Sequence, residues 1–199
     1  MAHRPGKAAI LRAAVEVMGE DGYEGSSTRV MAARAGVTVA ALYHHFPSKL
    51  DLLREFLDEA HEITIARVER RLAALDDPTP EARLDEAVAT LIATHLHDEF
   101  ARRASNVALR EYTRLAPVDR AAIDAKRSLL LAVFAALVAD FPEVADPHET
   151  ARAIVILCSS LVEPFVEEMD RSMADVIALY QSFARRLVGI APGGSRVAV

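Results

Sequence analysis

The sequence predicts an all-α protein of about nine helices, because two patterns recur along its 199 residues. Apolar residues return at intervals of three and four, which places them on one face of a helix. β-branched residues do not alternate with polar ones over a useful length, as they would in strands. Glycines and prolines separate the apolar segments at helical lengths. We therefore expect a three-helix N-terminal domain followed by a larger helical domain.

Four helices are expected in the N-terminal part of the chain. The first ends at Gly22 and Gly25, and a short second helix ends at Gly36. A short third helix ends before Pro47, since proline lacks the N–H that a helix interior needs. A long fourth helix over residues 48–75 would link the two domains.

The later helix boundaries are expected near Asp98, at Pro117, around residues 141–147 and at residues 170–172. The helix expected from Asp119 to Phe141 is apolar nearly all round over residues 129–138. A helix of that kind is typical of the middle of a domain, so we expect it to run through the centre of the C-terminal body.

Composition limits the cellular setting. An apolar content of 52% supplies a large core, and the single cysteine, Cys158, excludes an internal disulfide framework. The N-terminal residues lack the apolar centre of a secretion signal, and the apolar run at residues 129–138 is too short to cross a bilayer. We therefore expect a cytoplasmic protein without a membrane partner.

The charge of the chain is divided unevenly. The net charge is −6, yet residues 1–49 hold six basic and four acidic side chains, whereas the remainder holds 17 basic and 25 acidic ones. A basic N-terminal part beside an acidic body would present only that part to an anionic polymer such as DNA.

The segment from Thr28 to Lys49, TRVMAARAGVTVAALYHHFPSK, has the pattern of a helix-turn-helix. Thr28 can cap the second helix, and Met31 and Ala35 then face the core. Gly36 can adopt the positive φ that a sharp exit from a helix requires. The third helix, which follows, is the expected recognition helix.

Small side chains on the outer side of this third helix would let it enter the major groove. Thr38 can cap the helix and bind a phosphate, while Tyr43 and His44 offer donors to the DNA backbone. Lys49 lies at the next helix N-terminus, where its charge and the free amides suit a phosphate. The predicted DNA-binding residues are Thr28, Arg29, Thr38, Val39, Ala40, Ala41, Tyr43, His44 and Lys49.

At these positions the sequence resembles the TetR family of transcriptional regulators, over about residues 7–57. Met31, Val39 and Ala40 depart from the residues usual in the family, which bears on base preference and not on DNA binding itself. The matching residues are Thr28, Ala32, Ala35, Gly36, Val37, Thr38, Leu42, Tyr43, His45, Phe46, Ser48 and Lys49.

The resemblance implies a ligand-responsive DNA-binding regulator, above all a repressor that a lipophilic small molecule releases from a palindromic operator. It divides the chain into a helix-turn-helix DNA-binding domain (1–48) and a helical effector-binding and dimerisation domain (49–190). Residues 191–199, which include two glycines and a proline, are expected to form a disordered tail.

The resemblance also implies a homodimer formed through the last two long helices. Two apolar stripes at helical spacing fit that expectation, since two stripes per subunit would make a four-helix interface by two-fold symmetry. The alternative, that both stripes face the core of one subunit, stays open. The stripes are Ile154, Leu157, Cys158, Leu161, Phe165 and Met169, and Val176, Leu179, Tyr180, Phe183 and Leu187.

An effector pocket is expected beside the apolar helix after Pro117. A basic group formed by Arg102, Arg103, Arg110 and Arg114 could bind an acidic or phosphorylated head, and residues 104–127 look somewhat like family members that respond to acyl-CoA thioesters. Core packing and a solvated basic face remain the alternatives. The predicted ligand-binding residues are Leu91, Leu96, Phe100, Arg103, Val107, Arg110, Tyr112, Leu130, Phe134 and Leu137.

Two other classes of function stay open in the sequence: a DNA-binding protein without a ligand, and a small helical enzyme. We expect no catalytic residue, no metal and no cofactor. His95 and Asp98 could share one side of a helix, but two ligands do not make a metal site. Cys158 has no charged neighbour to activate its thiol.

Overall fold

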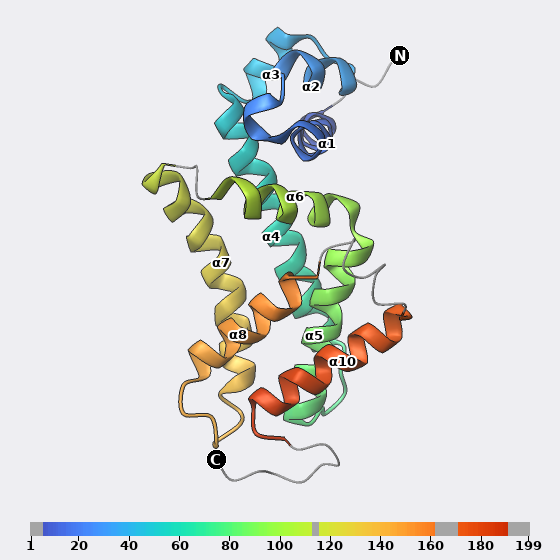
Figure 1. The fold of residues 1–199 in the computed structure, drawn as a ribbon, viewed down its shortest axis with the longest axis vertical. Helices are drawn as coiled ribbons and strands as arrows, with labels where there is room; N and C mark the ends of the chain where they lie inside the picture. Colours follow the sequence, from blue (N-terminus) through green and yellow to red (C-terminus); the bar gives the residue numbers. More distant parts are fainter. Residues whose placement is uncertain (1–5, 113–115, 162–170, 191–199) are drawn as a thin grey trace. The chain divides into compact units, whose positions relative to one another are not determined.

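A computed structural model describes residues 6–112, 116–161 and 171–190 (Figure 1). In this part of the chain the regular elements are nine α-helices, which confirms the predicted fold class. The breaks expected near Asp98 and at Pro117 are confirmed as well. The predicted tail, residues 191–199, lies outside the described residues. The helices are α1 Lys7–Gly25, α2 Thr28–Arg34, α3 Val39–His45, α4 Lys49–Ala73, α5 Pro80–His97, α6 Glu99–Glu111, α7 Pro117–Val138, α8 Pro147–Ser159 and α10 Met173–Leu187.

The contacts between helices divide the chain into two compact units. The first unit holds the described residues up to His61 together with Phe100–Lys126, and the second holds Glu62–Glu99 and the described residues from Arg127 onward. Each unit has its own apolar core. The first unit thus includes nearly all of α6 and the first half of α7, which the sequence did not connect with the helix-turn-helix.

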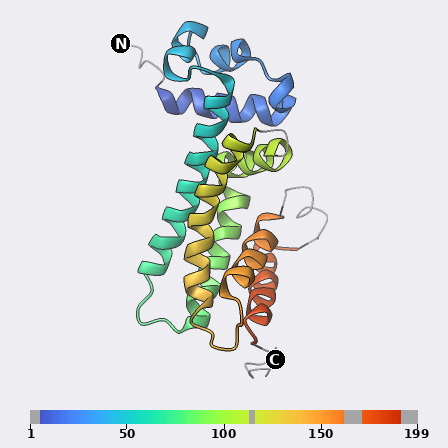
Figure 2. The same cartoon turned by 90° about the vertical axis from the view of Figure 1, so that its left-hand side faces the viewer.

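In the first unit, α1, α2 and α3 gather around the start of α4 (Figures 1 and 2). The apolar face of α1 meets side chains that recur along α4 at helical spacing, which is why these elements bury one stripe each. Two residues of α6, Ala104 and Val107, and one of α7, Ile123, complete this core. The fully buried large side chains of this core are Ile10, Met18, Met31, Leu42, Leu52, Leu53, Phe56 and Leu57.

In the second unit, α5, α8 and α10 pack side by side (Figures 1 and 2). Helix α5 is buried nearly all round, and its carboxylate Asp85 pairs with Arg185 of α10. Gln181 of α10 donates to the Asp85 carbonyl at 3.0 Å. Helix α10 starts at a capping box in which the Ser172 and Asp175 side chains satisfy each other's backbone N–H.

The expectation that the apolar helix after Pro117 runs through the centre of the body is wrong. On α7 the side chains of Phe134 and Leu137 are buried, but Leu129 is 54% exposed and Ala132 and Ala136 are exposed too. The apolar composition therefore reflects one core-facing stripe and a second apolar stripe on the outside, and α5 is the central helix. No helix in the described part of the chain has the length and apolar character that a membrane span needs.

Candidate nucleic-acid interface

The turn between α2 and α3 is made by Gly36, whose φ of 68° confirms the positive φ predicted for this position. The N–H of Val37 donates to the Ala32 carbonyl at 2.9 Å, and the Gly36 N–H donates to Ala33 at 3.1 Å. These two bonds form a Schellman motif that satisfies the last carbonyls of α2. The chain can therefore leave α2 and enter α3 within a few residues.

Helix α3 begins at Thr38, whose hydroxyl accepts a hydrogen bond from the Ala41 N–H at 3.1 Å, so the predicted cap is confirmed. Its buried side chain is Leu42, and Phe46 just beyond it packs into the core. All nine predicted DNA-binding residues lie at the surface to some degree. Exposed are Arg29, Thr38, Ala40, Tyr43 and His44, and half-buried are Thr28, Val39, Ala41 and Lys49.

The expected capping role of Thr28 is wrong, because the N-cap of α2 is Ser27 and Thr28 is the first helical residue. The Thr28 hydroxyl instead lies 3.2 Å from the Tyr43 hydroxyl of α3. This pair connects the two motif helices at the surface. Sequence reasoning missed it, since no spacing rule joins residues that are 15 positions apart across a turn.

Lys49 has partners within the protein. Its ammonium group donates to the carbonyls of Tyr23, Ser26 (3.1 Å) and Glu24 (3.4 Å), and lies 4.5 Å from the centre of the Tyr23 ring. These bonds use the three hydrogens of the ammonium group and satisfy carbonyls at the end of α1. A phosphate contact by Lys49 stays a prediction, and it would have to replace one of these bonds.

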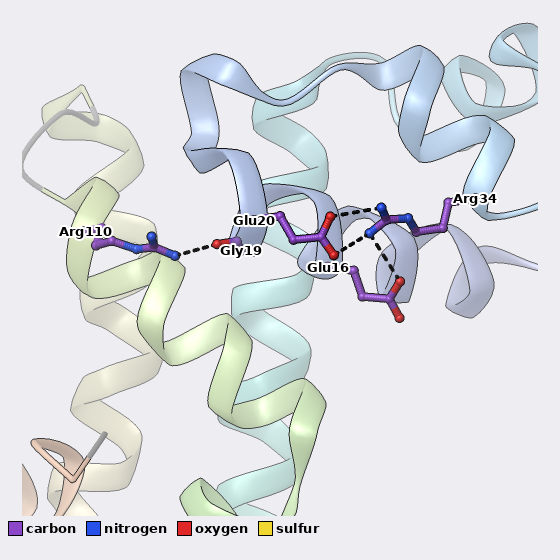
Figure 3. A network of polar contacts seen from close by, with 5 residues as sticks. All are labelled: Glu16, Gly19, Glu20, Arg34 and Arg110. Atoms are coloured by element: carbon purple, nitrogen blue, oxygen red, sulfur yellow. Dashed lines mark hydrogen bonds and ion pairs between the residues drawn. The ribbon is translucent and has the colours of Figure 1, made fainter. Parts of the chain in front are cut away.

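A network of ion pairs and hydrogen bonds connects α1 with α2 and α6 (Figure 3). The Arg34 guanidinium forms two bonds of 2.9 Å with the Glu20 carboxylate and lies 3.7 Å from Glu16. The hydrogen bonds from Arg34 lower the pKa of Glu20 below its ordinary value. On the other side of α1, Arg110 of α6 donates to the Gly19 carbonyl at 3.0 Å.

The predicted ligand-binding residues are distributed over both units. In the first unit, Val107 belongs to the core, Phe100 and Tyr112 pack against it, and the Tyr112 hydroxyl donates to Asp124 at 2.6 Å. Arg110 is engaged with α1, and the positive charge of Arg103 contributes to the lowered pKa of Glu20. In the second unit, the core contains Leu91, Leu130, Phe134 and Leu137, with Leu96 packed against it. Convergence of these residues on one ligand stays a prediction, and Arg114 lies outside the described residues.

The two apolar stripes expected at a dimer interface belong largely to the core of one subunit. Five of their residues are buried there, so the interpretation of these five as interface residues is wrong. Helical spacing shows which residues share a face but not what that face contacts. Phe165 and Met169 lie outside the described residues. The five buried residues are Ile154, Cys158, Leu161, Val176 and Tyr180.

The side chains weighed for enzyme chemistry have structural partners. The Nδ1 atom of His95 lies 2.9 Å from the Leu91 carbonyl, and Asp98 pairs with Arg67 at 2.6 Å. Burial raises the pKa of Cys158 to about 12, which disfavours the reactive thiolate. Within the described residues no three His, Cys, Asp or Glu side chains gather as a metal site would require.

The contacts of Lys49 predict a stabilising role that can be measured. Lys49→Met keeps much of the apolar stem but removes three charge-assisted hydrogen bonds, so the free energy of unfolding should fall by about 1.5–3 kcal/mol. Lys7 of the same unit provides the matched control, because its ion pair with Glu55 is exposed and Lys7→Met should cost less than about 1 kcal/mol. Urea denaturation of both variants at one protein concentration makes the comparison. Equal losses would contradict the role given to Lys49.

Comparison with known proteins shows a similarity that extends beyond the helix-turn-helix. A family profile described as "Bacterial regulatory proteins, tetR family" matches residues 10–56. The HTH-type transcriptional repressor KstR of Mycolicibacterium smegmatis is 30% identical over 153 residues, which cover 77% of this chain and 72% of KstR. A tetR-family regulatory protein from Rhodococcus RHA1 superimposes with a TM-score of 0.80 at 27% identity, over 94% of this chain and 100% of that one.

A further similar structure is AibR in complex with isovaleryl coenzyme A and operator DNA. It has a TM-score of 0.68 at 23% identity and covers 92% of this chain and 95% of its own. At that identity the similarity concerns the fold alone, whereas KstR shares sequence over most of both proteins. This chain belongs to the tetR family of bacterial regulatory proteins, and it is a DNA-binding transcriptional regulator.

Proposed function

We propose that this regulator is a repressor that binds a palindromic operator as a homodimer and leaves it when a lipophilic, acidic small molecule binds. The observation that carries the proposal is the outer face of α3. Thr38, Ala40, Tyr43 and His44 are exposed there, while Leu42 holds the helix to the core. Such a helix can enter a major groove without giving up its own packing.

The hydroxyl pair of Thr28 and Tyr43 would bind one phosphate of the operator backbone. Only one of the two O–H groups can donate within the pair, so the other is available to donate to a phosphate oxygen. Arg29 is exposed and would add charge-driven affinity. Base edges would be read by residues from Thr38 to His44, where the small side chain of Ala40 allows close approach.

Selection of the wild-type protein from random-sequence DNA should recover a palindrome. Its half-sites should lie one helical turn apart, about 34–36 Å, or a multiple of that distance, because each subunit of a two-fold dimer presents one α3. Tyr43→Phe keeps the ring and removes the O–H, so it should weaken binding to the recovered duplex and to random duplexes alike, by about two- to tenfold.

Two results would contradict this part of the proposal. If no palindrome is enriched, the proposed palindromic operator is wrong. A Tyr43→Phe protein that keeps backbone affinity but changes the selected sequence would assign Tyr43 to the bases and not to a phosphate. The melting temperature serves as the folding control, since Tyr43 is 43% exposed and its hydroxyl supports no core contact.

We place the dimer interface on the outer faces of α8 and α10. Ile156 of α8 is 53% exposed and Leu187 of α10 is 44% exposed, which places a large apolar side chain on the outer face of each helix. Ala153 is exposed one turn before Ile156, so α8 presents a narrow apolar strip that a second α8 could cover. Two helices from each subunit would then form a four-helix interface with two-fold symmetry.

Ile156→Glu should convert the dimer into a monomer of 21.7 kDa in light scattering, because a buried and unpaired charge costs several kcal/mol. Leu129→Glu on α7 is the matched control, since Leu129 is exposed to the same degree and lies outside α8 and α10. Wild-type protein that is monomeric at micromolar concentration would contradict the interface. A substitution of Leu161 is unsuitable, because that residue is buried in its own subunit.

An acyl thioester or a related lipophilic acid is the effector class that we propose. KstR is named a transcriptional repressor, and AibR was crystallised with an acyl-CoA and operator DNA. In the second unit of this chain, apolar side chains of α5 and α7 could surround an acyl chain, notably Leu91, Leu130 and Phe134. The ligand must bind the DNA-free conformation more tightly, since equal affinity for both conformations would release nothing.

A series of acyl-CoA thioesters tests the effector class, with free coenzyme A as the control that lacks the acyl chain. An active compound should stabilise the protein by about 2.7 kcal/mol at 100 times its Kd and should displace the recovered operator. Phe134→Leu should weaken the response while operator affinity without ligand stays close to wild type. If no thioester or free fatty acid raises the melting temperature while operator binding is intact, the proposed effector class is wrong.

A further inference from the structure

The helix α1 is broken at Gly22, and two consecutive residues of α6 occupy the break. Gly22 has φ 73° and ψ 171°, a combination that only glycine adopts readily. In an unbroken helix the Tyr23 N–H would donate to the Gly19 carbonyl, four residues earlier. The break turns this N–H away from the helix axis and leaves one donor and one acceptor to be satisfied by other groups.

The end of α6 supplies both missing partners. The Tyr23 N–H donates to the Glu111 carboxylate at 3.3 Å. The Gly19 carbonyl accepts from the Arg110 guanidinium at 3.0 Å (Figure 3). Glu111 is only 3% exposed, so its carboxylate is held in place within the unit. One hydrogen bond inside α1 is thus replaced by two bonds to neighbouring side chains of α6. We call Arg110 and Glu111 the α6 clamp.

The turn that follows the break also forms hydrogen bonds with Lys49, the first residue of α4. The Tyr23 carbonyl accepts from Lys49 and from the Ser26 hydroxyl, the latter at 2.7 Å. This turn leads through Ser27 directly into α2, the first helix of the DNA-binding motif. The position of α2 therefore depends on two sets of bonds to Tyr23. Glu111 of α6 accepts from its N–H, and Lys49 of α4 donates to its carbonyl.

We infer that Arg110 and Glu111 are positioning residues for operator binding, which hold the last turn of α1, and hence α2, in the arrangement that DNA requires. The inference rests on the DNA binding described above. It also gives Arg110 a role other than the one expected from the sequence, which was to bind an effector. Helix α6 follows α5 with Asp98 alone between them, so the clamp is joined by the chain itself to the second unit.

Glu111→Ala gives the sharpest test, because the clamp and simple electrostatics predict opposite signs. Loss of a carboxylate should by itself tighten DNA binding. Loss of the clamp should instead weaken affinity for the duplex selected with wild-type protein by about fivefold or more, since only a fraction of the molecules would hold α2 correctly. Glu111→Gln keeps an acceptor oxygen and should recover most of the affinity.

Gly22→Ala provides an independent test. A Cβ at Gly22 would lie 3.7 Å from the Glu111 carboxylate, which is ordinary contact, so the substitution acts on the backbone and not by collision. Alanine disfavours the broken conformation and should drive α1 toward a continuous helix that needs no clamp. Operator affinity should then fall as in Glu111→Ala, and the double variant should bind no worse than either single variant.

Hydrogen exchange gives a readout that does not depend on DNA. The Tyr23 amide should be protected in the wild type and should exchange roughly tenfold faster or more in Glu111→Ala, while the Val17 amide in the body of α1 stays unchanged. If Glu111→Ala proves unfolded, Arg110→Gln replaces it, because Arg110 is exposed and its substitution leaves the buried Glu111 in place.

The inference is overturned if folded Glu111→Ala binds the selected duplex as tightly as wild type, if Glu111→Gln binds no better than Glu111→Ala, or if the effects of Gly22→Ala and Glu111→Ala add. Failure of the DNA-binding proposal looks different. In that case the wild-type protein itself would select no duplex, and the protection of the Tyr23 amide would be the remaining test of the clamp.

Discussion

The contacts that join α1 to α2, α4 and α6 depend on the backbone conformation of Gly22. A positive φ with an extended ψ ends the regular hydrogen bonding of α1 and starts one more turn in a new direction. The backbone groups released by that change would be costly if they were left unpaired. Two side chains of α6, which lies far along the chain, satisfy them, and Lys49 of α4 donates to carbonyls of the turn that follows. The DNA-binding motif begins immediately after this turn, so the position of α2 depends on the position of the turn.

The parts of the fold that could be predicted from the sequence are those determined within one or two turns of helix. Gly36 is recognisable because few other residues tolerate its φ of 68°, and Thr38 because a hydroxyl at a helix start has an obvious partner three residues on. The contacts that escaped prediction join distant positions. Lys49 donates to carbonyls that lie between 23 and 26 positions earlier in the chain. Arg110 donates to a carbonyl 91 positions earlier. Residue type alone made the two side chains look like phosphate or effector ligands.

Hydropathy misled the prediction of the second unit for a related reason. A stripe of apolar residues identifies a face that avoids water, but it does not say which neighbour covers that face. Helix α7 is apolar on two faces and buries only one in the subunit, whereas α5 includes Thr90, Thr94 and His95 and is still the central helix. The same ambiguity explains the α8 and α10 stripes, whose central residues pack into their own subunit and leave Ile156 and Leu187 outside.

A break closed by side chains has a property that a continuous helix lacks. The hydrogen bond between Tyr23 and Gly19 of an unbroken α1 would be internal to that helix, so its energy could not depend on α6. The bonds from Glu111 and Arg110 depend on where α6 lies. A hydrogen bond contributes about 0.5–1.5 kcal/mol net, and more when one partner is charged. Two such bonds fall in the range of about 1–3 kcal/mol that commonly couples an effector to a distant binding site. A shift of α6 large enough to open both bonds would therefore change DNA affinity by an amount that matters for regulation, without any rearrangement of the apolar core.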